Sequence, residues 1–236
     1  MTQEWRLAVH EGSLAMPLIL LLVPVVVVLW VYFGRDAHAM PLLTPLVRDW
    51  DVDVLAAVHE YIVALLLFFV VPAIAGIIFL GYDPADLGLR AGDSRLGVRL
   101  VAILLPIALV VAYMGSFNPE LQAEYPLAKS AAFVPLSFLA VEAVYMAFYF
   151  AWEFLFRGFM LFGLEREWGP VAAVLIQTMA STIAHIGKPF PEIVAALLAG
   201  IVLGYVAVRT RSMVYGLVMH AVVGIALDVF ILWHIT

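Results

Sequence analysis

The chain has 236 residues, of which 65% are hydrophobic and 13% are charged, and its mean hydropathy is +1.07. So few charges, together with apolar runs long enough to cross a bilayer, exclude an ordinary soluble domain. The net charge of −6 and the lack of a basic run argue against a nucleic-acid partner. The chain has no cysteine, which excludes disulfides, thiolate metal sites and a cysteine nucleophile.

Seven apolar runs predict an all-α, polytopic bundle of about seven transmembrane helices in a lipid bilayer. The runs are Leu14–Phe33, Leu55–Leu80, Leu96–Met114, Val134–Phe150, Val171–Ile183, Ile193–Val208 and Met213–Trp233. The fifth run is the shortest. Because no internal repeat or long linker divides the chain, we expect residues 1–236 to form a single membrane domain.

The first run resembles a signal peptide with a cleavage site at Ala37–Ala39. Acidic residues in the leader, Glu4 and Glu11, and the length of the run favour a retained first span instead. Eight of the twelve Lys and Arg residues then fall on the side of the N-terminus and four on the other side. Since positive residues accumulate on the cytoplasmic side, we expect an integral membrane protein with a cytoplasmic N-terminus.

Turn chemistry sets the expected helix ends. Asp93 is placed to cap the third span, and the two prolines in Ile186–Pro191 end the fifth. Glu192 then falls in the first turn of the next helix, where the helix dipole favours an anion. The fourth helix is expected over about residues 131–164, roughly 50 Å, which exceeds the hydrocarbon thickness of about 30 Å. Its C-terminal end should therefore lie near an interface or be shielded within the bundle.

Glu153 and Arg157 lie in that end and are four residues apart, so they share one helix face. This pair is either structural or functional, because an ionisable residue at membrane depth is costly. Glu142 falls within about 20° of the same face, with Tyr145 and Tyr149 between as hydrogen-bond partners. We interpret Glu142 as a packed or protonated residue rather than as a second catalyst.

Two histidines and an aspartate follow in the last spans. His185 ends the fifth span, and Ser181 and Thr182 lie one turn earlier, placed to orient its ring. His220 precedes Asp228 by eight residues, so both can face a common interior. Taken singly, such residues are helix caps or a structural network. Glu, His, His and Asp together on successive spans favour a functional site.

These residues occur in an order that resembles the CAAX-protease and bacteriocin-processing family (CPBP, formerly Abi) of glutamate-type intramembrane proteases. The motifs of that family, E-E-x-x-x-R, F-x-x-x-H and H-x-x-x-N or a His–Asp variant, correspond here to Trp152–Arg157, Ser181–His185, and His220 with Gly224 and Asp228. The stretch His185–Glu192 is similar to an H-x-x-K-P-x-x-E extension of one bacterial branch. The resemblance covers Ser137 to the C-terminus.

This sequence departs from the family pattern at three positions. Trp152 replaces the first glutamate, Ser181 replaces the phenylalanine, and Gly224 replaces the asparagine. Glu153 is therefore the only carboxylate of its motif. If the first glutamate is indispensable, the chain is catalytically inactive.

The resemblance implies an endopeptidase that cleaves a membrane-associated protein or peptide near its terminus, with a catalytic core over about 134–236. It needs no cofactor and no metal. Glu153 and His185 would activate a water, Arg157 would fix the carboxylate, and His220, oriented by Asp228, would stabilise the oxyanion. The resemblance also implies the inner membrane of a bacterium. The sequence specifies neither the substrate nor the oligomeric state.

Two alternatives use the same residues. One is a zinc site formed by Glu153, His185 and His220, which are acceptable ligand types but are not arranged in an H-E-x-x-H pattern. The other is a non-catalytic membrane scaffold or a proton-coupled transporter, although the absence of an internal repeat disfavours a transporter.

Overall fold

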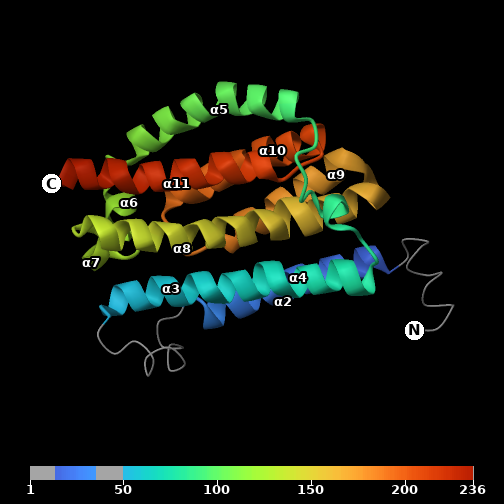
Figure 1. The fold of residues 1–236 in the computed structure, drawn as a ribbon, viewed down its shortest axis with the longest axis horizontal. Coiled ribbons are helices and arrows are strands. Elements are labelled where there is room, and N and C mark those ends of the chain that lie inside the picture. The colour runs from blue at the N-terminus through green and yellow to red at the C-terminus, as the bar shows by residue number, and fades with distance from the viewer. Residues whose placement is uncertain (1–13, 36–49, 236) are drawn as a thin grey trace.

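The computed structural model describes residues 14–35 and 50–235, and every regular element within these ranges is a helix (Figure 1). Six helical runs are long and apolar enough to cross a membrane, so the protein is an integral membrane protein. They are Ala15–Phe33, Val52–Phe79, Ser94–Gly115, Pro135–Ala184, Phe190–Thr210 and Val214–His234. The prediction of an all-helical polytopic bundle is confirmed. The proposed cleavage site at 37–39 lies outside the described residues.

Ten α-helices are described, with bounds α2 Ala15–Phe33, α3 Val52–Ala64, α4 Val71–Ile74, α5 Ser94–Gly115, α6 Pro119–Glu124, α7 Lys129–Ala132, α8 Pro135–Glu153, α9 Leu161–Ala184, α10 Phe190–Thr210 and α11 Val214–Ile235. π-helical segments flank α4, at Leu65–Val70 and Ala75–Phe79, and a third joins α8 to α9, at Phe154–Met160. A short 3₁₀ helix, Pro84–Leu87, precedes α5.

The 50-residue run Pro135–Ala184 contains the fourth and fifth predicted spans. Gly169 interrupts it with a non-helical conformation (φ 75°, ψ 171°), and Pro170 follows at once. Positive φ is accessible to glycine at little cost, and proline then opens a new helix. The predicted fourth helix thus begins at Pro135 and continues to Gly169. In Figure 1, the chain turns back within α9 at one end of the bundle. The C-terminal end of α11 and the start of α2 lie at opposite ends of the bundle.

Several helix ends follow the predicted turn chemistry. The Asp93 carboxylate accepts a hydrogen bond from the backbone N–H of Leu96, which caps α5. The fifth span ends at Ala184, before the proline-containing break. Glu192 lies in the first turn of α10, as expected. These ends set the length of the helices that carry the polar residues.

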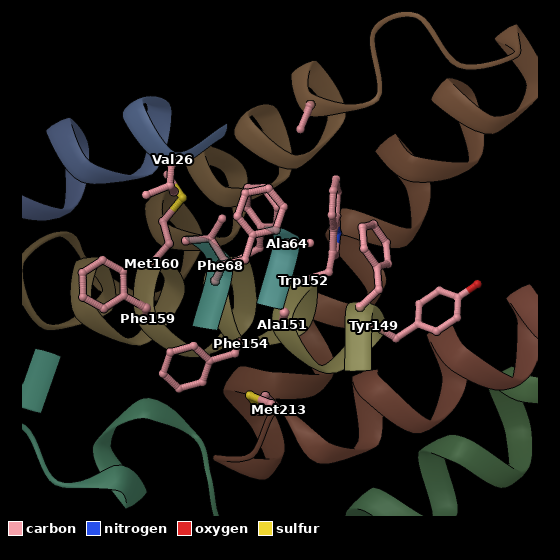
Figure 2. Packing of buried hydrophobic residues seen from close by; sticks show 14 of the residues in the cluster. Val26, Ala64, Phe68, Tyr149, Ala151, Trp152, Phe154, Phe159, Met160 and Met213 are labelled. Atoms are coloured by element: carbon pink, nitrogen blue, oxygen red, sulfur yellow. The ribbon is translucent and has the colours of Figure 1, made fainter. Parts of the chain in front are cut away.

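The run formed by α8, the π-helical segment and α9 is the centre of the bundle. Half of its most apolar stretch is buried, compared with 11% for the outer helix α5. Every residue of Phe154–Met160 is buried. Figure 2 shows Phe68, Trp152 and Tyr149 in the same part of this core. The end of α8 is therefore shielded within the bundle, which is one of the two predicted outcomes.

Candidate active site

Glu153 is the last residue of α8, and Arg157 lies in the π-helical segment that follows. Such segments displace side chains from the regular helical register and are frequent at functional sites. The Arg157 guanidinium reaches back to the Glu153 carboxylate as an ion pair. Glu153 is 0% exposed and Arg157 is 2% exposed. The expected pair is present, and it lies inside the bundle.

One oxygen of Glu153 accepts two hydrogen bonds. Its Oε1 is 3.0 Å from Nη1 of Arg157 and 2.8 Å from Nδ1 of His220. Bonds of this kind to a carboxylate are among the stronger ones in proteins. The other oxygen, Oε2, is buried without a hydrogen-bond partner and lies close to Gly216. A Cβ at position 216 would come within 3.1 Å of this oxygen, so the backbone of α11 closes over the carboxylate.

His220 connects this carboxylate with a cavity of about 480 Å³. A carboxylate oxygen only accepts, so the Nδ1 of His220 carries the hydrogen and donates it. In the neutral ring, Nε2 is then left as an acceptor. The His220 side chain is 26% exposed and lines the cavity, whereas Glu153 is not among the described residues that line it. Glu153 therefore influences the cavity through His220.

His185 lines the same cavity from the end of α9. Its Nδ1 donates to the backbone carbonyl of Ser181 at 2.7 Å, so the predicted orientation by the preceding turn is present. Burial lowers the pKa of His185 to about 4, and the nearby charge of Arg157 acts in the same direction. The ring is neutral at pH 7 and, like that of His220, presents Nε2 as an acceptor.

Trp152 occupies the cavity wall beside His185. The indole is 2% exposed and meets the imidazole edge-on, with ring centroids 4.9 Å apart. On its other sides it packs against Trp30, Phe68 and Phe156 at 4.9–5.8 Å. The position that is a glutamate in the related motif is thus an apolar part of the cavity wall in this chain.

Tyr149 explains the departure from the family motif at Gly224. A Cβ built on Gly224 would lie only 1.7 Å from the Tyr149 hydroxyl oxygen. The hydroxyl therefore occupies the space that a side chain at position 224 would need. The Tyr149 ring also contacts His220, with centroids 4.9 Å apart, and both residues line the cavity. A phenolic O–H thus lies next to the histidine on α11.

Asp228 lines the cavity, but at a distance from His220. Its carboxyl group lies beside that of Glu142 on α8. Among the hydrogen bonds of the described residues, none joins Asp228 to His220. The predicted roles therefore separate: Asp228 pairs with the carboxyl on α8 and His220 pairs with Glu153.

The structure thus brings Glu153, Arg157 and His220 into direct contact and places His185 on the same cavity. Sequence reasoning missed that Tyr149 lies over Gly224. The signal was the missing side chain at position 224, which left space for another group. Among the described residues, no group of three or more His, Asp and Glu side chains is arranged to hold a metal ion. The geometry therefore gives no support to the zinc alternative.

Comparison with known families bears directly on this site. Residues 134–226 match the family model described as type II CAAX prenyl endopeptidase Rce1-like. The chain carries a domain of this family. No curated protein and no solved structure shows significant similarity to the chain.

The Rce1-like domain is an endopeptidase domain, so the family is one of enzymes that hydrolyse peptide bonds. The matched segment contains all or most of three helical runs that are apolar enough to cross a membrane, so it is similar to an intramembrane endopeptidase domain. The match contains Glu153, Arg157, His185 and His220 and ends before Asp228. The predicted resemblance is confirmed for this segment.

The buried ion pair predicts a large loss of stability when one partner is removed. Arg157→Met leaves the Glu153 carboxylate without its counter-charge, which costs about 3–5 kcal/mol for a buried pair. Adding Glu153→Gln to Arg157→Met should restore part of the lost stability, because neither charge of the pair is then left buried. Reversible unfolding in mixed micelles, followed by circular dichroism, measures both changes.

Arg166→Met is the matched control, since Arg166 pairs with Asp86 at 2.8 Å and both side chains are exposed. Exposed pairs contribute about 0–1 kcal/mol. If Arg157→Met is no more destabilising than Arg166→Met, the buried pair does not stabilise the bundle.

Proposed function

We propose that this protein hydrolyses a peptide bond of a membrane-associated protein or peptide, near a terminus, with a water held between His185 and His220. The observation that supports this most directly is that both imidazoles line one cavity while their Nδ1 atoms are already engaged. Two Nε2 acceptors on one cavity suit the two hydrogens of a water molecule.

In this mechanism, His220 is the general base. Its Nε2 takes a proton from the water while the water oxygen forms a bond to the substrate carbonyl carbon. Glu153 stabilises the imidazolium through Nδ1, and Arg157 holds the carboxylate in place. The C–N bond of the tetrahedral intermediate then breaks, and His220 returns the proton to the leaving amine. Such acid–base catalysis contributes about 10²–10⁴-fold.

This division of roles differs from the one that the family resemblance implied, in which Glu153 was the base and His220 the oxyanion donor. The enclosure of Glu153 favours the new assignment, because a carboxylate behind the cavity wall acts on water most directly through the imidazole in front of it. His185 keeps its expected role as a partner of the water.

A donor is then needed for the developing oxyanion, and we assign this role to Tyr149. Its hydroxyl lies beside His220 and over Gly224, on the cavity wall. An O–H donor directed at the developing charge stabilises the transition state more than the ground state. The absence of a side chain at position 224 leaves the hydroxyl the space for this role.

A second function is favoured by one specific observation, the indole of Trp152 beside His185. With an apolar ring there and Glu153 enclosed, the same cavity would bind a peptide segment without cleaving it. In that case the protein is a membrane scaffold that shields its partners. Peptide binding without turnover by the wild-type protein distinguishes this function from proteolysis.

The proposed dyad predicts non-additive losses of activity. Purified full-length protein in micelles is supplied with internally quenched peptides of randomised sequence, and cleavage is followed by fluorescence. We expect Glu153→Gln and His220→Ala each to lower kcat by about 10²–10⁴-fold. The double variant should be no slower than His220→Ala, because Glu153 acts through His220.

Glu120→Gln, on the exposed face of α6, is the control and should cleave at the wild-type rate. Full activity of Glu153→Gln would falsify the dyad. If the wild-type protein binds the peptides but does not cleave them, the result supports the scaffold function instead of proteolysis.

Tyr149→Phe tests the oxyanion donor. Loss of such a donor typically lowers kcat by about 10²–10³-fold, and we expect KM to change little. Gly224→Ala should have a similar effect, because its methyl group would displace the hydroxyl. Tyr113→Phe, at an exposed position on α5, is the matched control. A loss confined to KM would mean that Tyr149 only packs the cavity wall.

We propose that the chain forms a single domain in a bacterial inner membrane with its N-terminus in the cytoplasm, because Lys and Arg accumulate on that side. The chain has no cysteine, so single cysteines test the orientation. Ser94→Cys, at the start of α5, should react with an impermeant maleimide only from the cytoplasm. Ala123→Cys, in α6, should react only from outside; the reverse pattern would invert the topology. Both positions are exposed.

A further inference from the structure

The cavity has a second polar end that the proposed reaction does not use. Glu60 from α3, Glu192 from α10 and Asp228 from α11 all line it. Asp228 follows His220 by eight residues on α11, which places it about 12 Å further along the helix. Asp228 is therefore separate from His220, although both line the same cavity.

Two of these carboxyl oxygens are buried without hydrogen-bond partners. Asp228 is 2% exposed, and its Oδ1 has no hydrogen-bond partner. Glu192 accepts a hydrogen bond from the Tyr125 hydroxyl through Oε1 at 2.8 Å, while its Oε2 has no partner. Acceptors left without donors in a buried cavity are costly, so this end is suited to a ligand that donates hydrogen bonds.

The cations nearby are already engaged. Lys188 pairs with Glu124 at 2.8 Å and lies over the ring of Tyr125. Arg35 donates to the carbonyl of Ile186 and lies over the ring of Trp30. These two cations are outnumbered by the five carboxyl groups that gather here. Those groups belong to Glu60, Glu124, Glu142, Glu192 and Asp228.

Aromatic rings line the same cavity as three of these carboxyl groups. Tyr61 and Tyr145 stack with centroids 4.6 Å apart, and Tyr149 continues the row at 4.3 Å from Tyr145. All three line the cavity. Aromatic faces beside carboxylates attract a cation both through the ring quadrupole and through charge-assisted hydrogen bonds. A metal ion fits this end poorly, because no cluster of metal-binding geometry occurs in the described ranges.

We propose that this acidic, aromatic end of the cavity is a subsite for a cationic side chain, Arg or Lys, of the peptide substrate. The proposal rests on the proposed function for the position of the scissile bond, which lies at His185 and His220. An extended peptide advances about 3.3–3.6 Å per residue. A span of about 12 Å therefore places the basic residue roughly three to four positions from the scissile bond.

Peptides with a single arginine test this register. Internally quenched peptides carry one Arg at one to six positions on either side of the cleaved bond, and each has a twin with citrulline, which is neutral and nearly isosteric. With purified full-length protein, we expect kcat/KM to be at least about ten-fold higher for Arg than for citrulline at three to four positions on one side. At the other positions the ratio should be close to one.

The ratio of kcat/KM for the Arg peptide to kcat/KM for its citrulline twin, measured within each variant, identifies the carboxyl groups that bind the arginine. Glu192→Gln and Asp228→Asn should each reduce the ratio at the preferred position toward one. Glu120→Gln, which is remote and exposed, should retain it. No preference for Arg at any position, or a preference that survives both variants, overturns the subsite and leaves the proteolytic function standing.

A binding measurement separates failure of the subsite from failure of the proposed function. Fluorescence anisotropy compares the affinity of the wild-type protein for the Arg and citrulline peptides without any turnover. If no peptide is cleaved but Arg peptides bind at least about ten-fold more tightly, and Asp228→Asn removes the difference, the subsite stands and proteolysis falls. Equal affinities in a protein that does not cleave would overturn both.

Discussion

The bundle depends on the buried carboxylate of Glu153, because a buried charge is costly unless a counter-charge and hydrogen-bond donors offset it. Arg157 supplies the counter-charge from the same helical run, and His220 supplies a hydrogen bond from α11. Gly216 allows the backbone of α11 to lie close to the carboxylate. The requirement to satisfy one carboxylate thus fixes where α11 crosses α8 and turns His220 toward the cavity.

The aromatic core then determines what can reach the histidines. Trp152 packs against Trp30 of α2 and against Phe68 of the π-helical segment between α3 and α4. It also contacts the ring of His185. A second carboxylate at position 152 would place a further buried negative charge near Glu153, with only one guanidinium, that of Arg157, to balance both. The indole removes that electrostatic cost. It also makes the wall beside His185 apolar, and in the proposed mechanism the proton transfers then belong to His220.

Much of the fold could be predicted from the sequence, because it follows from local chemistry. The lengths of the apolar runs predicted the spans, and the proline and glycine residues predicted the break after Ala184. The pair Glu153–Arg157 followed from helical spacing. The hydrogen bond between His220 and Glu153 could not be predicted in this way. The two residues are 67 positions apart in sequence, so the bond depends on how their helices pack together. The pairing of Asp228 with Glu142 rather than with His220 is non-local for the same reason.

Gly224 shows how a departure from a motif acquires meaning only in three dimensions. In the sequence it is a lost donor, because glycine has no side chain. In the fold, the space that such a side chain would need already contains the Tyr149 hydroxyl, from a different helix. A tyrosine on α8 and a side chain on α11 therefore exclude one another, and either can place a polar group beside His220. The loss of a hydrogen-bond donor from one helix therefore does not show that the cavity lacks a donor, because a neighbouring helix can place a donor in the same space.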